Sequence, residues 1–428
     1  MISTADVEQL QQVLMTPAKD DRQAALERLR SWKSTPIDRE AAHALLTAAA
    51  LDFPAVPGTY SPVPSEELVR LLWDQPQAPD PRFVEQILPS LPKDAQLAAI
   101  RLLASNPNGA VPLADVLRAI AGGQLIVTPG FWPVLMPLQR FPHASGELAG
   151  PLTALLSRAE WTNDAGAVLL SFAKASALDE EQRSELAGWL ADQLPRRLYG
   201  LADTLSAQGM EARWSEDGGY SPARAAAGLL LDLASHIRDD RLAAALQQAA
   251  EHLDPWLVTW GVLGLARLGH EPPGAAIEIA AADPECRLVV LDGLTELGMA
   301  DLIDDRWRTQ LSIAEADMVR WLTFPSELGR PPTQIEHIQA FTIDEDGKPA
   351  DLFLFKFRTD PPHWSADDGW MVGVSGPFRQ ADSPTIQSGG MTFSRFESLD
   401  SRSPAEHLEA LAGTIREWAQ AHGRKLPG

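Results

Sequence analysis

DPWLVTWGVLGLARLG, which begins at Asp254, and DPECRLVVLDGLTELG, which begins at Asp283, are two copies of one pattern, 29 residues apart. Six of their sixteen aligned positions are identical. The identical pairs are Asp254/Asp283, Pro255/Pro284, Gly264/Gly293, Leu265/Leu294, Leu268/Leu297 and Gly269/Gly298. A pattern that recurs in this way predicts that the chain stacks similar structural units.

The shared residues are those that begin and end a helix. An Asp side chain accepts hydrogen bonds from the free amides of the first turn. Pro at the first helical position loses no hydrogen bond, and Gly after the last turn can take the left-handed conformation that ends the helix. Ser221-Pro222 restates the same start 33 residues before Asp254. The sequence therefore predicts at least three units, each a capped helix followed by a shorter one.

The second copy resembles the short HEAT-like repeat of the phycobilisome-lyase type, a helix pair that opens with Asp-Pro and closes with Leu-Gly. The resemblance is clearest over residues 221–300 and looser over the first two-thirds of the chain. It implies an α-solenoid and brings no catalytic residues. In that family an Arg at the position of Arg287 bonds to an acidic residue of the neighbouring repeat, whereas the upstream copy has Val258 there.

The pattern changes after Leu311 from helical periodicity to alternation. IEHIQAFTI (335–343), DLFLFKFR (351–358), WMVGVSG (370–376) and a segment from Met391 predict four strands. Phe353, Phe355 and Phe357 share one face of the second strand. We expect that face to pack against a capped amphipathic helix that begins at Ser403.

These patterns predict a mostly α fold, a HEAT-like α-solenoid over residues 1–311 followed by a small antiparallel α+β domain over residues 312–428. The C-terminal domain resembles no family that we can name.

Composition narrows the functional classes. The chain has 428 residues, a formal net charge of −22 and one cysteine, Cys286. Such an acidic chain is repelled by a phosphate backbone, so we expect no nucleic-acid partner. No apolar run approaches the ~20 residues that a membrane span requires. The N-terminal residues lack the pattern of a secretory signal, which together with the composition predicts a bacterial-type cytoplasmic protein without a membrane partner.

The loop PPHWSADDGW, residues 361–370, is the best candidate for chemistry. Its His and two carboxylates could hold a metal or move a proton. The same letters also describe a hairpin loop with an Asp-Asp-Gly turn above two packed tryptophans. A third interpretation makes the tryptophans anchors for a protein partner. The metal candidates are His363, Asp367 and Asp368, and the candidate anchors are Trp364 and Trp370.

Two further features bear on binding. The acidic loop before the clear repeats carries Glu211, Glu216 and Asp217, which could attract a basic protein partner. Trp256 and Trp260 lie one turn apart on a repeat helix. Aromatic residues at helical spacing are usually core, but they can also mark a concave binding face.

Together these features favour a non-enzymatic protein-binding scaffold or adaptor with an acidic solenoid surface. A specific form is an inhibitor or immunity-type protein that neutralises a basic partner. The alternative is a metal-dependent enzyme with its site in the C-terminal domain. No cofactor motif and no catalytic residue are predicted.

Overall fold

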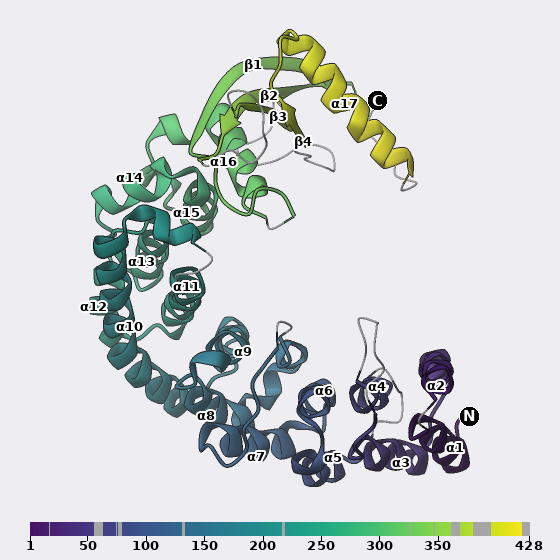
Figure 1. The fold of residues 1–428 in the computed structure, drawn as a ribbon. Helices are drawn as coiled ribbons and strands as arrows, with labels where there is room; N and C mark the ends of the chain where they lie inside the picture. The colour runs from purple at the N-terminus through teal and green to yellow at the C-terminus, as the bar shows by residue number, and fades with distance from the viewer. Residues whose placement is uncertain are drawn as a thin grey trace. The chain divides into compact units, whose positions relative to one another are not determined.

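The computed structural model describes residues 1–16, 18–54, 63–73, 75, 79–130, 133–215, 219–324, 326–345, 347–360, 369–379 and 395–421. Within them the chain is mostly helical and carries a small antiparallel sheet near its C-terminal end, as the sequence predicts (Figure 1). None of the helices in these residues has the length and apolarity needed to cross a lipid bilayer.

The chain divides into two compact units, Met1–Asp192 and Gln193–Gly428. The boundary that the sequence predicts between residues 311 and 312 lies inside the second unit. It stays a prediction.

The first unit is built from helices. They are α1 (Thr4–Leu14), α2 (Lys19–Ser31), α3 (Arg39–Ala49), α4 (Pro64–Arg70), α5 (Pro81–Ile87), α6 (Lys93–Ser105), α7 (Ala110–Ala121), α8 (Ser145–Leu155) and α9 (Thr162–Lys174). The long helix α10 (Glu180–Gln208) crosses from this unit into the second.

Helix pairs form the first part of the second unit. Its elements after α10 are the short 3-10 helix η6 (Met210–Trp214), α11 (Tyr220–Ile237), α12 (Ala243–Ala250), α13 (Pro255–Arg267), α14 (Gly274–Ala282), α15 (Pro284–Glu296) and α16 (Gln310–Leu322). Figure 1 shows α11, α13 and α15 stacked next to one another, with α12 and α14 in a second layer on their left.

The repeated pattern forms the predicted helices α13 and α15. The Asp254 carboxylate accepts the Trp256 amide at 3.0 Å, and Asp283 accepts the Glu285 amide at 2.9 Å. After the helices, Gly269 has a φ of 82° and Gly298 a φ of 71°, in the left-handed region that a Cβ disfavours. The sequence prediction of two capped helices is confirmed.

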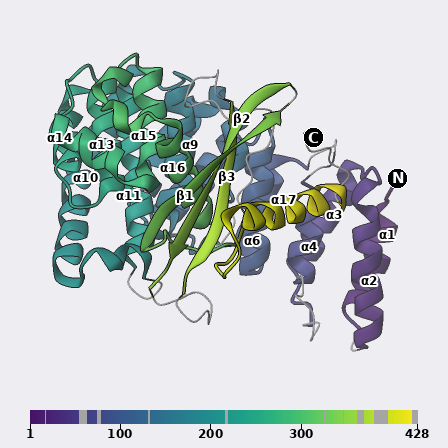
Figure 2. The same ribbon diagram turned by 90° about the horizontal axis from the view of Figure 1, so that it is seen from above.

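The C-terminal sheet contains β1 (Gln334–Glu345), β2 (Lys348–Arg358), β3 (Met371–Arg379) and β4 (Arg395–Ser398) in sequence order, with each neighbouring pair antiparallel. Helix α17 (Pro404–Ala421) follows the last strand, and it lies beside the sheet (Figure 2). A capping box between Ser403 and Glu406 begins the helix where the sequence predicts.

The expected packing of the phenylalanine face is wrong. Leu352 and Leu354, on the opposite face of β2, share a hydrophobic cluster with Leu411 of α17. The phenylalanine face turns toward α16: the Phe396 ring lies 5.8 Å from Phe357 and 5.6 Å from Trp321 of that helix. The sheet is therefore covered by α17 on one face and by α16 on the other.

Candidate functional site

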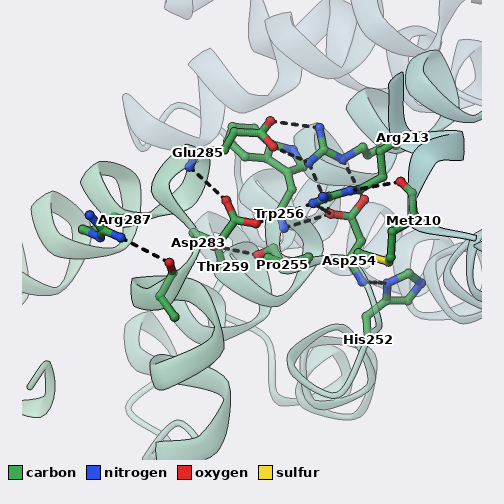
Figure 3. Close-up of polar contacts among 12 residues, drawn as sticks. Met210, Arg213, His252, Asp254, Pro255, Trp256, Thr259, Asp283, Glu285 and Arg287 are labelled. Carbon is green, nitrogen blue, oxygen red and sulfur yellow. Dashed lines mark hydrogen bonds and ion pairs between the residues drawn. The ribbon is translucent and has the colours of Figure 1, made fainter. Parts of the chain in front are cut away.

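The first turns of α11, α13 and α15 meet, and they bring together a set of charged side chains. Arg224 comes from α11, Asp254 caps α13 and Glu285 lies in the first turn of α15. Arg224 bonds to both carboxylates. We call Arg213, Arg224, Asp254, Asp283 and Glu285 the charged cluster. Most of it is shown in Figure 3.

Asp254 is the centre of the charged cluster and is fully buried. Its carboxylate accepts hydrogen bonds from Arg224 Nε at 2.7 Å and from the Tyr220 hydroxyl at 2.9 Å, in addition to the Trp256 amide. Burial by itself favours the neutral acid, but the Arg224 charge and these hydrogen bonds outweigh it, so the pKa of Asp254 lies below its ordinary value. Asp254 is therefore a fixed anion that holds α11 against α13.

Glu285 accepts hydrogen bonds from the same Arg224 guanidinium. Arg224 Nη1 and Nη2 each donate to one Glu285 oxygen at 3.1 Å. Burial raises the pKa of Glu285, and the Arg224 charge only partly opposes that effect. The Arg224 guanidinium also lies over two indoles, 5.2 Å from the Trp214 ring centroid and 5.5 Å from that of Trp256.

Arg213 approaches the charged cluster from η6. Its Nη1 lies 3.5 Å from Asp283 Oδ2 and 4.0 Å from Asp254 Oδ1, while its Nε donates to the Met210 carbonyl at 3.3 Å. Figure 3 shows this side chain reaching toward Asp254. The second arginine therefore ties η6 to the starts of α13 and α15.

His252 contacts the charged cluster through the Asp254 backbone, as a neutral imidazole. The Asp254 amide donates to His252 Nδ1 at 2.9 Å, and His252 Nε2 lies 3.2 Å from the Leu198 carbonyl. Nδ1 must accept and Nε2 must donate, which selects the tautomer with the proton on Nε2. Burial lowers the pKa of His252, in agreement with this neutral form.

A groove of about 330 Å³ lies beside the charged cluster, along α11. The Trp256 and Trp260 rings form one wall, with centroids 5.7 Å apart and planes at 85°. Glu285 and Asp232 also line the groove. Asp232 bonds to Arg267 Nη1 at 2.9 Å.

This arrangement suits binding better than proton transfer. Asp232, Asp254 and Glu285 each accept hydrogen bonds from an arginine, which holds them in place as anions. Within the part of the chain that the structure describes, no group of three or more His, Cys, Asp or Glu side chains could hold a metal ion. What the groove offers a ligand is aromatic surface beside carboxylate charge.

Of the eight acidic-loop and C-terminal-loop residues proposed from the sequence for partner or metal binding, the structure describes two, Glu211 and Trp370. Glu211 is exposed on η6, two residues from Arg213. The Trp370 ring is half-buried, with Lys356 Nζ 4.7 Å and Arg358 Cζ 5.0 Å from its centroid. The candidates that lie outside the described residues are Glu216, Asp217, His363, Trp364, Asp367 and Asp368.

Sequence reasoning missed Arg224, Asp232 and Glu285 as site residues. It read Asp254 as a helix cap only, and it left Trp256 and Trp260 open between core and binding face. The available signal was the helix ARAAAGLLLDLASHI, in which Arg224 and Asp232 interrupt an otherwise apolar run. Charged residues in such a position require buried partners.

No protein-family model matches this chain, and no curated protein matches it either.

Proposed function

We propose that this chain is a non-enzymatic protein-binding adaptor, whose helical repeats present an acidic surface to a basic protein partner. The observation that carries the proposal is the imbalance of charge in the helical part of the second unit. Residues 193–322 hold 20 acidic and 11 basic side chains.

Buried pairing does not account for that imbalance. Arg213, Arg224, Arg267 and Arg287 are largely buried, and they pair with Asp232, Asp254, Asp283, Glu285 and Glu315. The rest of the segment holds 15 acidic and seven basic side chains. The negative excess therefore belongs to residues outside these fold-stabilising pairs, where it can attract a cationic partner.

The contacts of Arg287 support the repeat part of the proposal. Arg287 Nη1 donates to Glu315 Oε2 at 2.7 Å and to the Ser312 carbonyl at 2.6 Å, both on α16. Its guanidinium lies 4.6 Å from the Trp307 ring centroid. An arginine that joins one helix pair to an acid of the next is the contact that the HEAT-like resemblance implies.

The test is the identity of the partner. The tagged full-length protein should capture, from its own cells at low salt, a protein whose isoelectric point is above about 9. The purified partner should then bind with an affinity that falls as salt is raised. Specific capture of a neutral or acidic partner, with binding insensitive to salt, would contradict the proposal.

A further inference from the structure

The groove between α11 and α13 has the dimensions of a side-chain pocket. Ser221, Ala225, Leu229 and Asp232 follow one another along a single face of α11 and line it. Arg224 and Asp232 are eight positions apart on α11, a rise of roughly 12 Å. A volume of about 330 Å³ is at the lower end for ligand pockets and leaves room for one long side chain.

Gly228 allows the two indoles of the aromatic wall to pack closely against α11. A Cβ at this position would lie 2.8 Å from Trp256 Nε1 and 3.2 Å from Trp260 Nε1. Only a glycine therefore lets both indoles rest against α11 without displacement. The resulting corner offers a large apolar and π-electron surface, which attracts cations as well as apolar groups.

The charges around this corner favour a cation. Asp232, Asp254, Asp283 and Glu285 carry four negative charges, and the three arginines that pair with them are Arg213, Arg224 and Arg267. His236 also lies 3.5 Å from Asp232, and it adds positive charge only when protonated. The arginine and carboxylate members of this set are three and four in number, so charge complementarity favours a cation in the groove over an anion.

The chain already shows how a guanidinium is held here. The Arg224 guanidinium lies over the rings of Trp214 and Trp256 while it bonds to Glu285. A carboxylate has lone pairs for about four hydrogen bonds. Glu285 accepts two hydrogen bonds from Arg224, one on each oxygen. A planar guanidinium can combine stacking with hydrogen bonds to a carboxylate, which the compact ammonium of lysine does less well.

We propose that this groove binds an arginine side chain of the basic protein partner. Its aliphatic stem lies along Ala225 and Leu229, and its guanidinium packs against Trp260 beside Asp232. The inference rests on the proposed function, and it defines which part of the acidic surface makes the specific contact.

The first test uses a blocked Gly-Gly-Arg-Gly-Gly peptide and the same peptide with citrulline, the neutral analogue of arginine. Indole N–H resonances of the full-length protein are followed by NMR, with Trp256 and Trp260 assigned from Trp→Phe variants. The arginine peptide should shift both resonances with a dissociation constant on the order of millimolar, as expected for a single side chain. An equal response to the citrulline peptide, or no response to either, would overturn the inference.

A matched pair of variants makes the test independent of folding defects. Ala225 and Ala223 are both exposed on α11, but only Ala225 lines the groove. Ala225→Arg places the protein's own guanidinium in the groove and should abolish the peptide response. Ala223→Arg makes the same change in charge and should leave the response unchanged. Circular dichroism and thermal unfolding should be alike for both.

The same pair separates this inference from the proposed function. If the groove is the contact, affinity for the captured basic partner should fall at least about tenfold (about 1.4 kcal/mol) in Ala225→Arg and less than about threefold in Ala223→Arg. Equal affinities in the two variants would reject the groove while leaving the adaptor function in place. Failure to find any basic partner would reject the adaptor function, and the peptide response would still decide whether the groove binds arginine.

Discussion

Asp254 and Asp283 occupy the same place in two similar helices, but their surroundings differ. Asp283 caps α15 and is partly exposed, whereas Asp254 caps α13 and also holds the buried Arg224. Asp283→Ala should lower the free energy of unfolding by about 0.5–2 kcal/mol, the usual value of a cap. Asp254→Ala should cost about 3–5 kcal/mol, because it leaves a buried guanidinium short of a partner.

Both losses of unfolding free energy can be measured in the second unit by urea unfolding, with hydrogen exchange of peptides from residues 220–300 as the readout. Equal losses in the two variants would mean that Asp254 acts only as a cap.

His252 should make the second unit sensitive to mild acid. Its pKa is lowered in the folded protein by burial, while in the unfolded chain it has the ordinary value near 6.5. The unfolded state therefore takes up the proton first, and the free energy of unfolding should fall as the pH is lowered from about 7.5 through about 6.5. His252→Asn, which retains an acceptor for the Asp254 amide, should flatten this part of the pH profile.

His270 provides the matched control, because it is exposed. Urea midpoints between pH 5.5 and 7.5, roughly one unit either side of the ordinary histidine pKa, should keep the wild-type slope in His270→Asn. A wild-type slope in His252→Asn would remove His252 as the cause.

For single residues, the sequence predicted the helix caps but did not predict the charged cluster. Capping depends on residues two or three positions apart, which a local pattern contains. The partners of Arg224 are 30 and 61 positions away, so the charged cluster exists only after the repeats have stacked. The sequence could show that Arg224 and Asp232 needed partners, but not which ones.

Substitution by alanine at two helical glycines of the second unit, Gly261 and Gly200, should change the free energy of unfolding in opposite directions. A Cβ at Gly261 of α13 would lie 2.4 Å from the Ala250 amide nitrogen and 2.8 Å from the Leu246 carbonyl oxygen, both backbone atoms of α12. Backbone cannot rotate away, so Gly261→Ala should separate the two helices at a cost of about 1–3 kcal/mol or more. A Cβ at Gly200 of α10 meets no atom within 4 Å, and Gly200→Ala should stabilise by about 0.5–1 kcal/mol.

Thermal unfolding of the two variants beside wild type would check the signs. A neutral Gly261→Ala would show that α12 and α13 can move apart freely.

The sheet illustrates what an alternating pattern can and cannot predict. Alternation in β2 separated Phe353, Phe355 and Phe357 from Leu352 and Leu354, and that separation is confirmed. It could not say which helix each face would meet, because both faces are apolar and a helix covers each. The leucine face packs against α17, and the face with the larger phenylalanines packs toward α16.

The role of α16 bears on the domain boundary of the whole chain. This helix joins the repeats through Arg287 and Glu315, and it joins the sheet through a hydrogen bond from Ser375 Oγ to Asp317 Oδ2 at 3.1 Å. A fragment that keeps α16 should therefore fold alone. We expect residues 309–428, which begin at the Thr309 cap of α16, to give a dispersed NMR spectrum.

A fragment of residues 334–428 is the control, since it lacks α16 and exposes the phenylalanine face. It should aggregate or stay unfolded. If residues 309–428 are unfolded as well, the sheet depends on the repeats, and residues 193–428 form a single folding unit.

The acidity of the whole molecule gives the last prediction, which concerns the rate of association with the basic partner. Exposed charge pairs are individually weak, on the order of 0–1 kcal/mol, so attraction by residues 193–322 must be collective and screened by salt. The association rate should fall at least about tenfold between roughly 0.05 M and 0.5 M salt, while the dissociation rate changes less.

Glu211, Asp240 and Glu296 are exposed in the helical part of the second unit and lie outside the charged cluster. Replacing all three with their amides should slow association roughly threefold or more at low salt. Glu8, Asp21 and Glu40 are exposed in the first unit, and the same three changes there should slow it less. Stopped-flow or surface-based kinetics would measure the rates. Association that is equally fast at every salt concentration would show that the acidity serves solubility alone, and the contact would then have to be sought on the aromatic residues of the C-terminal region.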